Sequence, residues 1–136
     1  MRSYEYFEHD ADIGVVGRGA TVERAFESAA EAMFAVMAEP ASLREPAEVS
    51  VSFVEDDIDL ALVQWLNALL GAARERGLVF RRFSLSRNGS RWEGRAWGEP
   101  WREEIERGVE VKGATLTMLS VKSGATGWEA RCVVDV

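Results

Sequence analysis

The sequence is poor in cysteine, proline and basic residues, and it has no long hydrophobic run. Its single cysteine, Cys132, cannot form an internal disulfide, which favours a reducing compartment. Three prolines and twelve glycines are too few for a collagen-like or low-complexity chain. No uncharged apolar stretch approaches bilayer-spanning length, and residues 1–20 lack the apolar core of a signal peptide. These absences predict a cytoplasmic protein with no membrane segment.

Basic residues are outnumbered, with 16 Lys and Arg against 23 Asp and Glu, so the net charge is −7. Nucleic-acid affinity depends largely on cationic side chains that neutralise phosphates. The balance therefore argues against direct nucleic-acid binding as the main activity, although it is compatible with a local basic patch. A length of 136 residues with 47% hydrophobic residues is enough for one domain, residues 1–136, with a core that needs no disulfide.

Apolar periodicity and helix-capping residues predict an α+β fold, with two helices packed on a largely antiparallel β-sheet. Thr21 and Asp57 are suitable N-caps for the two helices, and Gly77 is a suitable left-handed end for the second. Asn88-Gly89 indicates a type I′ hairpin turn. We expect helices over 21–37 and 57–76, and strands over 4–8, 12–16, 48–53, 79–87, 91–97, 109–121 and 128–135. Five residues should lie in the core: Phe26, Met33, Trp65, Leu66 and Leu69.

Common catalytic signatures are missing from the sequence, which has no P-loop, no serine elbow and no Cys-x-x-Cys pair. Cys132 alternates with apolar residues on the expected buried face of its strand, where cysteine is usually inert. Gly17-Arg18-Gly19 lacks the third glycine of a dinucleotide site and is better interpreted as a flexible turn between strand and helix. The acidic run Glu55–Asp59 is better interpreted as a helix cap than as a cation site. We therefore expect a protein without catalytic residues.

Carboxylates are concentrated near the two ends of the chain. Glu8, Asp10 and Asp12 stand beside His9 at the start of an apolar strand, which is compatible with a solvated corner between strands. Asp135 lies in opposite phase to the apolar residues of the last predicted strand, and the terminal carboxylate of Val136 follows it. Two such groups form a site for a hard cation if a third approaches, but spacing alone does not show that Asp12 does so.

Six segments spread over the chain form a recognisable set: Glu8–Gly14 (EHDADIG), Thr21–Phe34 (TVERAFESAAEAMF), Leu62–Leu70 (LVQWLNALL), Gly98–Trp101 (GEPW), Val109–Lys112 (VEVK) and Trp128–Val136 (WEARCVVDV). Taken together, they resemble the archease family along essentially the whole chain. Each segment is weakly diagnostic, but their number and order are specific.

The resemblance implies a non-enzymatic accessory protein. Archeases are partners of RtcB-type RNA-splicing ligases and promote ligase guanylylation and turnover in tRNA splicing and RNA repair. An alternative within the family is a chaperone-like module for an RNA-modifying enzyme such as a tRNA methyltransferase. The family's divalent cation site, usually described with Ca²⁺, carries over to Asp12, Asp135 and Val136. A hydrolase using a metal-bound water would also need a general base, for which His9 is the only histidine.

The chain departs from the family pattern in two places. The family usually has an Asp and a His between the Gly-Glu-Pro loop and the Val-Lys strand, but residues 102–107 (REEIER) contain neither histidine nor aspartate. A Tyr-His pair usually follows that strand, whereas Leu116-Thr117 stands here. These departures leave open whether the partner is the usual ligase or a divergent one.

Overall fold

The computed structural model describes residues 3–136. Its strands and helices follow one another along the chain as β1 (Tyr4–His9), β2 (Asp12–Gly19), α1 (Val22–Met37), a short 3-10 helix (Pro40–Ser42), β3 (Ala47–Val54), α2 (Ile58–Arg76), β4 (Leu78–Asn88), β5 (Arg91–Pro100), β6 (Gly113–Ala114), β7 (Ser120–Gly124) and β8 (Gly127–Asp135).

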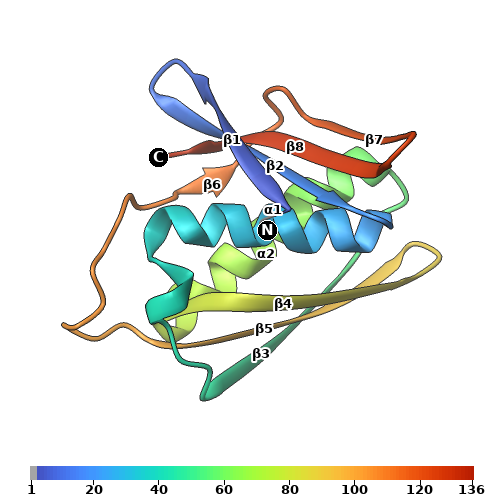
Figure 1. Ribbon diagram of the computed structural model, residues 1–136. Helices are drawn as coiled ribbons and strands as arrows, with labels where there is room; N and C mark the ends of the chain where they lie inside the picture. Colours follow the sequence, from blue (N-terminus) through green and yellow to red (C-terminus); the bar gives the residue numbers. More distant parts are fainter. Residues whose placement is uncertain (1–2) are drawn as a thin grey trace.

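The strands form two sheets, and the two helices lie between them (Figure 1). One sheet has the order β1-β2-β8-β6, with β7 also paired to β8; the other has the order β3-β5-β4. All strand pairs are antiparallel. The predicted architecture of two helices on antiparallel β-structure is confirmed, with the strands divided into two sheets. The division follows from α1, which is buried on most of its circumference and therefore needs apolar cover on two sides.

Both helices begin at the predicted caps, and α2 also ends at the predicted glycine. The Thr21 side chain accepts a hydrogen bond from the Arg24 amide, and the Asp57 carboxylate accepts from the amides of Asp59 and Leu60. The acidic run before α2 therefore caps that helix, as expected. Gly77 ends α2 with φ 66°, a left-handed conformation that glycine adopts without steric cost.

Two predicted local structures are wrong. Residues 109–121 do not form one strand, because only β6 and the start of β7 pair there, separated by a turn at 116–119. Alternating valines over 109–111 suggested a strand, but Val109 donates its N–H to the end of α1 instead.

The β4–β5 hairpin turns at Gly89-Ser90 rather than at Asn88-Gly89, since Asn88 pairs with Arg91. Only Gly89 has positive φ (64°), which excludes type I′.

The glycines of β2 also have a different role from the predicted turn. The strand continues to Gly19, and a Cβ on Gly17 would lie 2.3 Å from the Ala25 carbonyl oxygen and the Ala29 nitrogen. Glycine at this position allows the backbone of α1 to approach the sheet closely. The contact fixes the distance between α1 and the sheet that carries the candidate site.

The five predicted core residues are confirmed, because Phe26, Met33, Trp65, Leu66 and Leu69 are all fully buried. Trp65 also satisfies its indole N–H inside the core by donating to the Phe26 carbonyl at 3.0 Å. Among residues 3–136, neither helix combines the length and apolarity required to cross a membrane.

Candidate functional site

The pairing of β2 with β8 brings the two ends of the sequence together. Ile13 pairs with Val134, so the next residues along the two strands, Asp12 and Asp135, lie at the same end of the sheet. The amide of Val136 donates a hydrogen bond to Oδ1 of Asp12 at 3.2 Å. The structure therefore brings the three predicted residues together at one place, which we call the carboxylate corner (Asp12, Asp135 and Val136).

The strand register places the two aspartates on the sheet face turned away from the helices. Opposite residues share a face, and Val15 and Cys132 on the other face are fully buried against the helices. Asp135 is exposed and Asp12 is half-buried. Beside them, Phe7 covers Gly14, where a Cβ would lie 2.2 Å from the phenyl ring. This ring shields the sheet next to the corner while the carboxylates remain accessible.

The segment 111–114 forms the other edge of the corner. The Lys112 amide donates to the Asp135 carbonyl at 2.7 Å, and Gly113 and Ala114 then pair with β8 as β6. Asn67 of α2 makes two hydrogen bonds to Ala114, accepting from its amide at 2.9 Å and donating to its carbonyl at 3.2 Å. Asn67 thus substitutes for a neighbouring strand on the free side of β6.

A second side chain of α2 holds the same segment. The Arg74 guanidinium donates to the carbonyl of Val111 at 2.9 Å and also to that of Lys112. Sequence analysis did not identify Asn67 or Arg74 as part of this region. Their polar positions on α2 match the solvent-facing side of an amphipathic helix, and no local signal distinguishes a solvated Asn from one that binds a distant backbone.

The oxygen ligands available at the carboxylate corner suit a hard divalent cation. Carboxylate oxygens are the ligands that Ca²⁺ and Mg²⁺ prefer, and the corner supplies two aspartate side chains. Among residues 3–136, no three His, Cys, Asp or Glu side chains gather closely enough to hold a metal. A cation here would therefore need oxygen ligands beyond the two aspartates, and Val136, whose amide contacts Asp12, is the adjacent residue.

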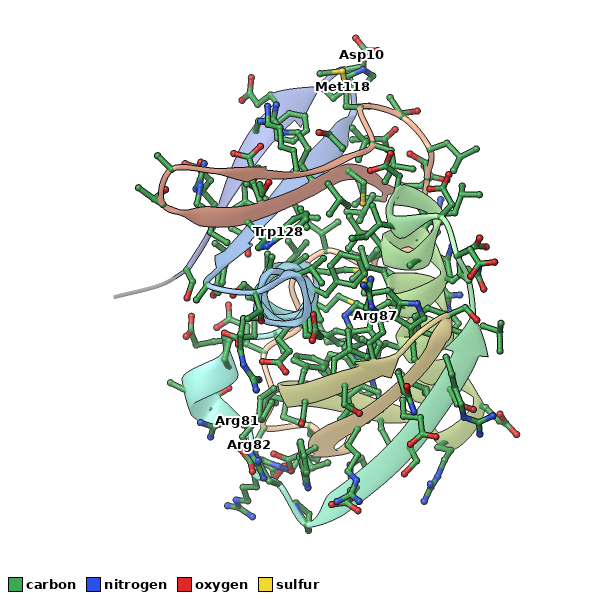
Figure 2. All side chains as sticks on the ribbon, turned by 90° about the vertical axis from the view of Figure 1, so that its right-hand side faces the viewer. Asp10, Arg81, Arg82, Arg87, Met118 and Trp128 are labelled. Atoms are coloured by element: carbon green, nitrogen blue, oxygen red, sulfur yellow. The ribbon has the colours of Figure 1, made fainter. Side chains whose placement is uncertain are left out.

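The remaining polar residues of the β1–β2 hairpin lie around the corner rather than in it. Asp10 is at the hairpin tip with φ 53°, its side chain is 92% exposed, and its carboxylate lies 3.9 Å from Nδ1 of His9 (Figure 2). Glu8 lines a hollow of about 380 Å³ between the hairpin and α1, which Asp12 also borders. The hairpin thus adds negative charge beside the corner.

The two segments that depart from the family pattern lie in different environments. Residues 102–107 belong to the long connection from β5 to β6, which is anchored to the end of α1 by hydrogen bonds from Gly108 and Val109. Leu116 is 64% exposed in the turn before β7, whereas the Thr117 carbonyl accepts a hydrogen bond from the Val133 amide. Neither segment contributes a side chain to the carboxylate corner.

Cys132 has the inert environment that its strand phase predicted. The thiol is fully buried against the helices, and desolvation raises its pKa to about 12. It therefore stays protonated at neutral pH and is a poor nucleophile.

Known proteins are similar to this chain along essentially its whole length. The model of the archease protein family matches residues 4–136. The chain belongs to the archease family. An archease from Sulfolobus acidocaldarius is 33% identical over 139 residues, and one from Thermococcus gammatolerans is 38% identical over 144 residues; each alignment covers 100% of both chains.

Two solved structures share the archease fold. The solution structure of protein 1598 from Methanobacterium thermoautotrophicum has a TM-score of 0.83 and 29% identity, with 100% of both chains covered. The crystal structure of an archease from Thermotoga maritima, described as a possible chaperone, has a TM-score of 0.67 and 18% identity, covering 97% of this chain and 96% of that one. At that identity the second structure supports the fold alone.

Proposed function

We propose that the protein is a non-enzymatic, metal-binding accessory protein that activates an RtcB-type RNA ligase in tRNA splicing and RNA repair. The observation that carries the proposal is the carboxylate corner, because the family's cation site matches residues that β2 and β8 hold together. The net charge of −7 is consistent with approach to a basic RNA-processing enzyme.

In this proposal Asp12, Asp135 and the carboxylate of Val136 hold one divalent cation, of which Ca²⁺ is the first candidate. The cation would supply a local positive centre on an acidic surface. The Val136 amide orients the Asp12 carboxylate through its 3.2 Å hydrogen bond, and the Lys112 amide fixes the Asp135 backbone. Both bonds leave the second oxygen of Asp12 and both side-chain oxygens of Asp135 available as ligands.

The test measures Ca²⁺ binding by calorimetry and, separately, guanylylation of the organism's own ligase at saturating GTP. Asp12→Asn keeps the size of the side chain but removes a charged ligand, so Ca²⁺ affinity should fall at least about tenfold and ligase stimulation should fall with it. Unchanged far-UV circular dichroism checks that the variant is folded.

Asp10→Asn is the matched control for this experiment. It removes the same charge two residues away, from a side chain outside the corner, and asparagine tolerates the left-handed backbone at φ 53°. It should change Ca²⁺ affinity less than about twofold. Equal losses from the two variants would mean that diffuse negative charge, and not the corner, binds the cation.

A second candidate function is a chaperone-like role toward an RNA-modifying enzyme such as a tRNA methyltransferase. The favouring observation is that the archease from Thermotoga maritima is described as a possible chaperone. Co-purification from the source organism distinguishes the two functions, because the ligase should be captured under the first proposal and a methyltransferase under the second.

For the first proposal, one result would show that the cation takes no part in activation: undiminished stimulation of the ligase by a folded Asp12→Asn variant that no longer binds metal.

A further inference from the structure

The outer face of the three-stranded sheet contains a polar trough that lies away from the carboxylate corner. It has a volume of about 490 Å³ and is lined by side chains of β3, β4 and β5. Along β5 the residues Arg91, Glu93 and Arg95 point away from the helices, in alternation with the buried Trp92, Gly94 and Ala96. The trough is therefore built on regular strands and not on loops.

Serines form the sides of this trough. Ser50 of β3 and Ser84 of β4 lie directly opposite Arg95, one on each side, and Ser52 and Ser86 lie opposite Glu93 in the same way. Serine is a weak strand former, and a solvated strand face more often carries longer side chains. The short side chains leave the Arg95 guanidinium standing in a concavity bordered by hydroxyl groups.

Most charged and aromatic groups around the trough already have partners. Arg91 donates to Glu93 at 2.9 Å, and the Trp97 indole donates to Glu48 at 2.7 Å. Arg82 donates to Glu45 at 2.8 Å while its guanidinium lies 3.8 Å from the Trp97 ring centroid.

Arg95 is the exception. Within residues 3–136 its side chain forms no hydrogen bond and no ion pair, and the side-chain hydroxyls of Ser50, Ser52 and Ser84 form none either. Ser86 donates only a long bond, 3.4 Å, to the Glu93 carbonyl. The trough therefore contains one uncompensated positive charge and three free hydroxyl donors at its centre.

The sequence around the trough contrasts in charge with the rest of the protein. Residues 78–100 contain five arginines and two glutamates, whereas the whole chain has a net charge of −7. One of these glutamates, Glu99, is buried away from the trough and paired with Arg102 at 2.7 Å. Glu45 pairs with both Arg81 and Arg82, so part of this positive charge is neutralised, whereas no acidic partner of Arg95 is found among residues 3–136.

We propose that the trough centred on Arg95 binds a phosphate group. A guanidinium forms two parallel, charge-assisted hydrogen bonds to a phosphate, which is the strongest contact available to Arg95 here. Ser50 and Ser84 lie two strand spacings apart, roughly 9–10 Å, which is wide enough for a tetrahedral anion hydrogen-bonded on both sides. A carboxylate offers two acceptor oxygens and one negative charge, whereas a phosphate offers more acceptor oxygens and more negative charge to the same arginine and serines. The phosphate could belong to a free anion, a nucleotide or an RNA strand.

The experiment follows backbone amide shifts of the full-length protein by NMR during titration with inorganic phosphate, with a nucleoside monophosphate and with a ten-nucleotide single-stranded RNA lacking terminal phosphates. We expect saturable shifts centred on Ser50, Ser84 and Arg95. Arg95→Gln should weaken binding at least about tenfold, because a charge-assisted contact is lost, and Glu93→Gln should strengthen it. Arg95→Lys keeps the charge without the planar fork and should weaken binding less than Arg95→Gln.

Arg87→Gln is the matched control, because Arg87 is on the same sheet but outside the trough, over the Trp92 ring. It should change the affinity for phosphate less than about twofold.

Tighter binding of RNA than of the small anions would identify an RNA strand as the source of the phosphate. The reverse order would identify a free phosphate or a nucleotide, and both outcomes support the site. Absence of localised shifts with all three probes, equal weakening by Arg87→Gln, or equally strong binding of acetate would overturn the proposal. Ligase stimulation does not enter this test, so its failure is separate from that of the proposed function.

Discussion

The two sheets pack on the same two helices through different residues, with a glycine on the five-stranded sheet and aromatic rings on the three-stranded sheet. On the five-stranded sheet, Gly17 lies against the backbone of Ala25 and Ala29, with almost no side chain between strand and helix. On the three-stranded sheet, Trp92 stacks between Phe26 and Phe53, at centroid distances of 5.2 and 5.8 Å. One interface is close because side chains are missing, and the other is filled by large rings.

The solvent-facing sides of the two sheets differ as well. The close contact under β2 leaves little freedom for the strand, so its register with β8 is fixed and the carboxylate corner is placed reproducibly. The aromatic layer supports a sheet whose solvent face carries arginines and serines. Asp10 and the labelled arginines Arg81 and Arg82 lie at opposite ends of the molecule (Figure 2). The carboxylate corner and the trough around Arg95 therefore belong to different sheets.

Removing a ring from the aromatic interface should have the largest effect on stability. Trp92→Ala deletes a fully buried side chain that stacks on two others, so the free energy of unfolding should fall by about 3–5 kcal/mol. Urea denaturation followed by circular dichroism measures this loss. Trp97→Ala, on the solvent face of the same strand, should cost less than about 1 kcal/mol. Similar losses from the two substitutions would show that the stack does not stabilise this interface.

Adding one methyl group should break the other interface. In Gly17→Ala the new Cβ meets helix backbone at 2.3 Å, and no rotamer change can relieve that contact. The free energy of unfolding should therefore fall by about 1–3 kcal/mol.

Gly71→Ala is the opposite control for that prediction. A Cβ at Gly71 meets nothing within 4 Å, and alanine favours helix, so this variant should be about 0.5–1 kcal/mol more stable. A stable Gly17→Ala variant would show that α1 can move away from β2 at little cost.

The parts of the fold that sequence analysis predicted correctly are those with local signals. Thr21, Asp57 and Gly77 mark helix ends through their own backbone and side-chain chemistry. The apolar spacing of Trp65, Leu66 and Leu69 likewise marks a buried helix face without any knowledge of its partner. The role of Gly17 depends on the close approach of α1, and the path of residues 109–121 depends on hydrogen bonds to α1, α2 and β8. Turn and strand preferences alone therefore gave the wrong answer there.

The candidate site divides in the same way. Strand phase predicted that Asp135 faces away from its apolar neighbours, and the structure confirms its exposure. Its proximity to Asp12 depends on β2 pairing with β8, which the sequence suggested only through resemblance to the family. Arg95 and its flanking serines were not predicted, because their arrangement exists only across three strands.

The smallest predicted change in stability, and the most local, is at Asn67. Asn67→Ala removes two solvent-exposed hydrogen bonds to Ala114, so the free energy of unfolding should fall by no more than about 1 kcal/mol. The Ala114 amide, however, loses its acceptor and should exchange its hydrogen much faster, while the Thr115 amide keeps its bond to the Val133 carbonyl. Asn67→Asp retains the acceptor and should keep Ala114 protected. Glu75→Ala, an exposed position on the same helix, should alter neither amide. If Ala114 stays protected in Asn67→Ala, the Asn67 side chain has no part in holding β6 at the edge of the carboxylate corner.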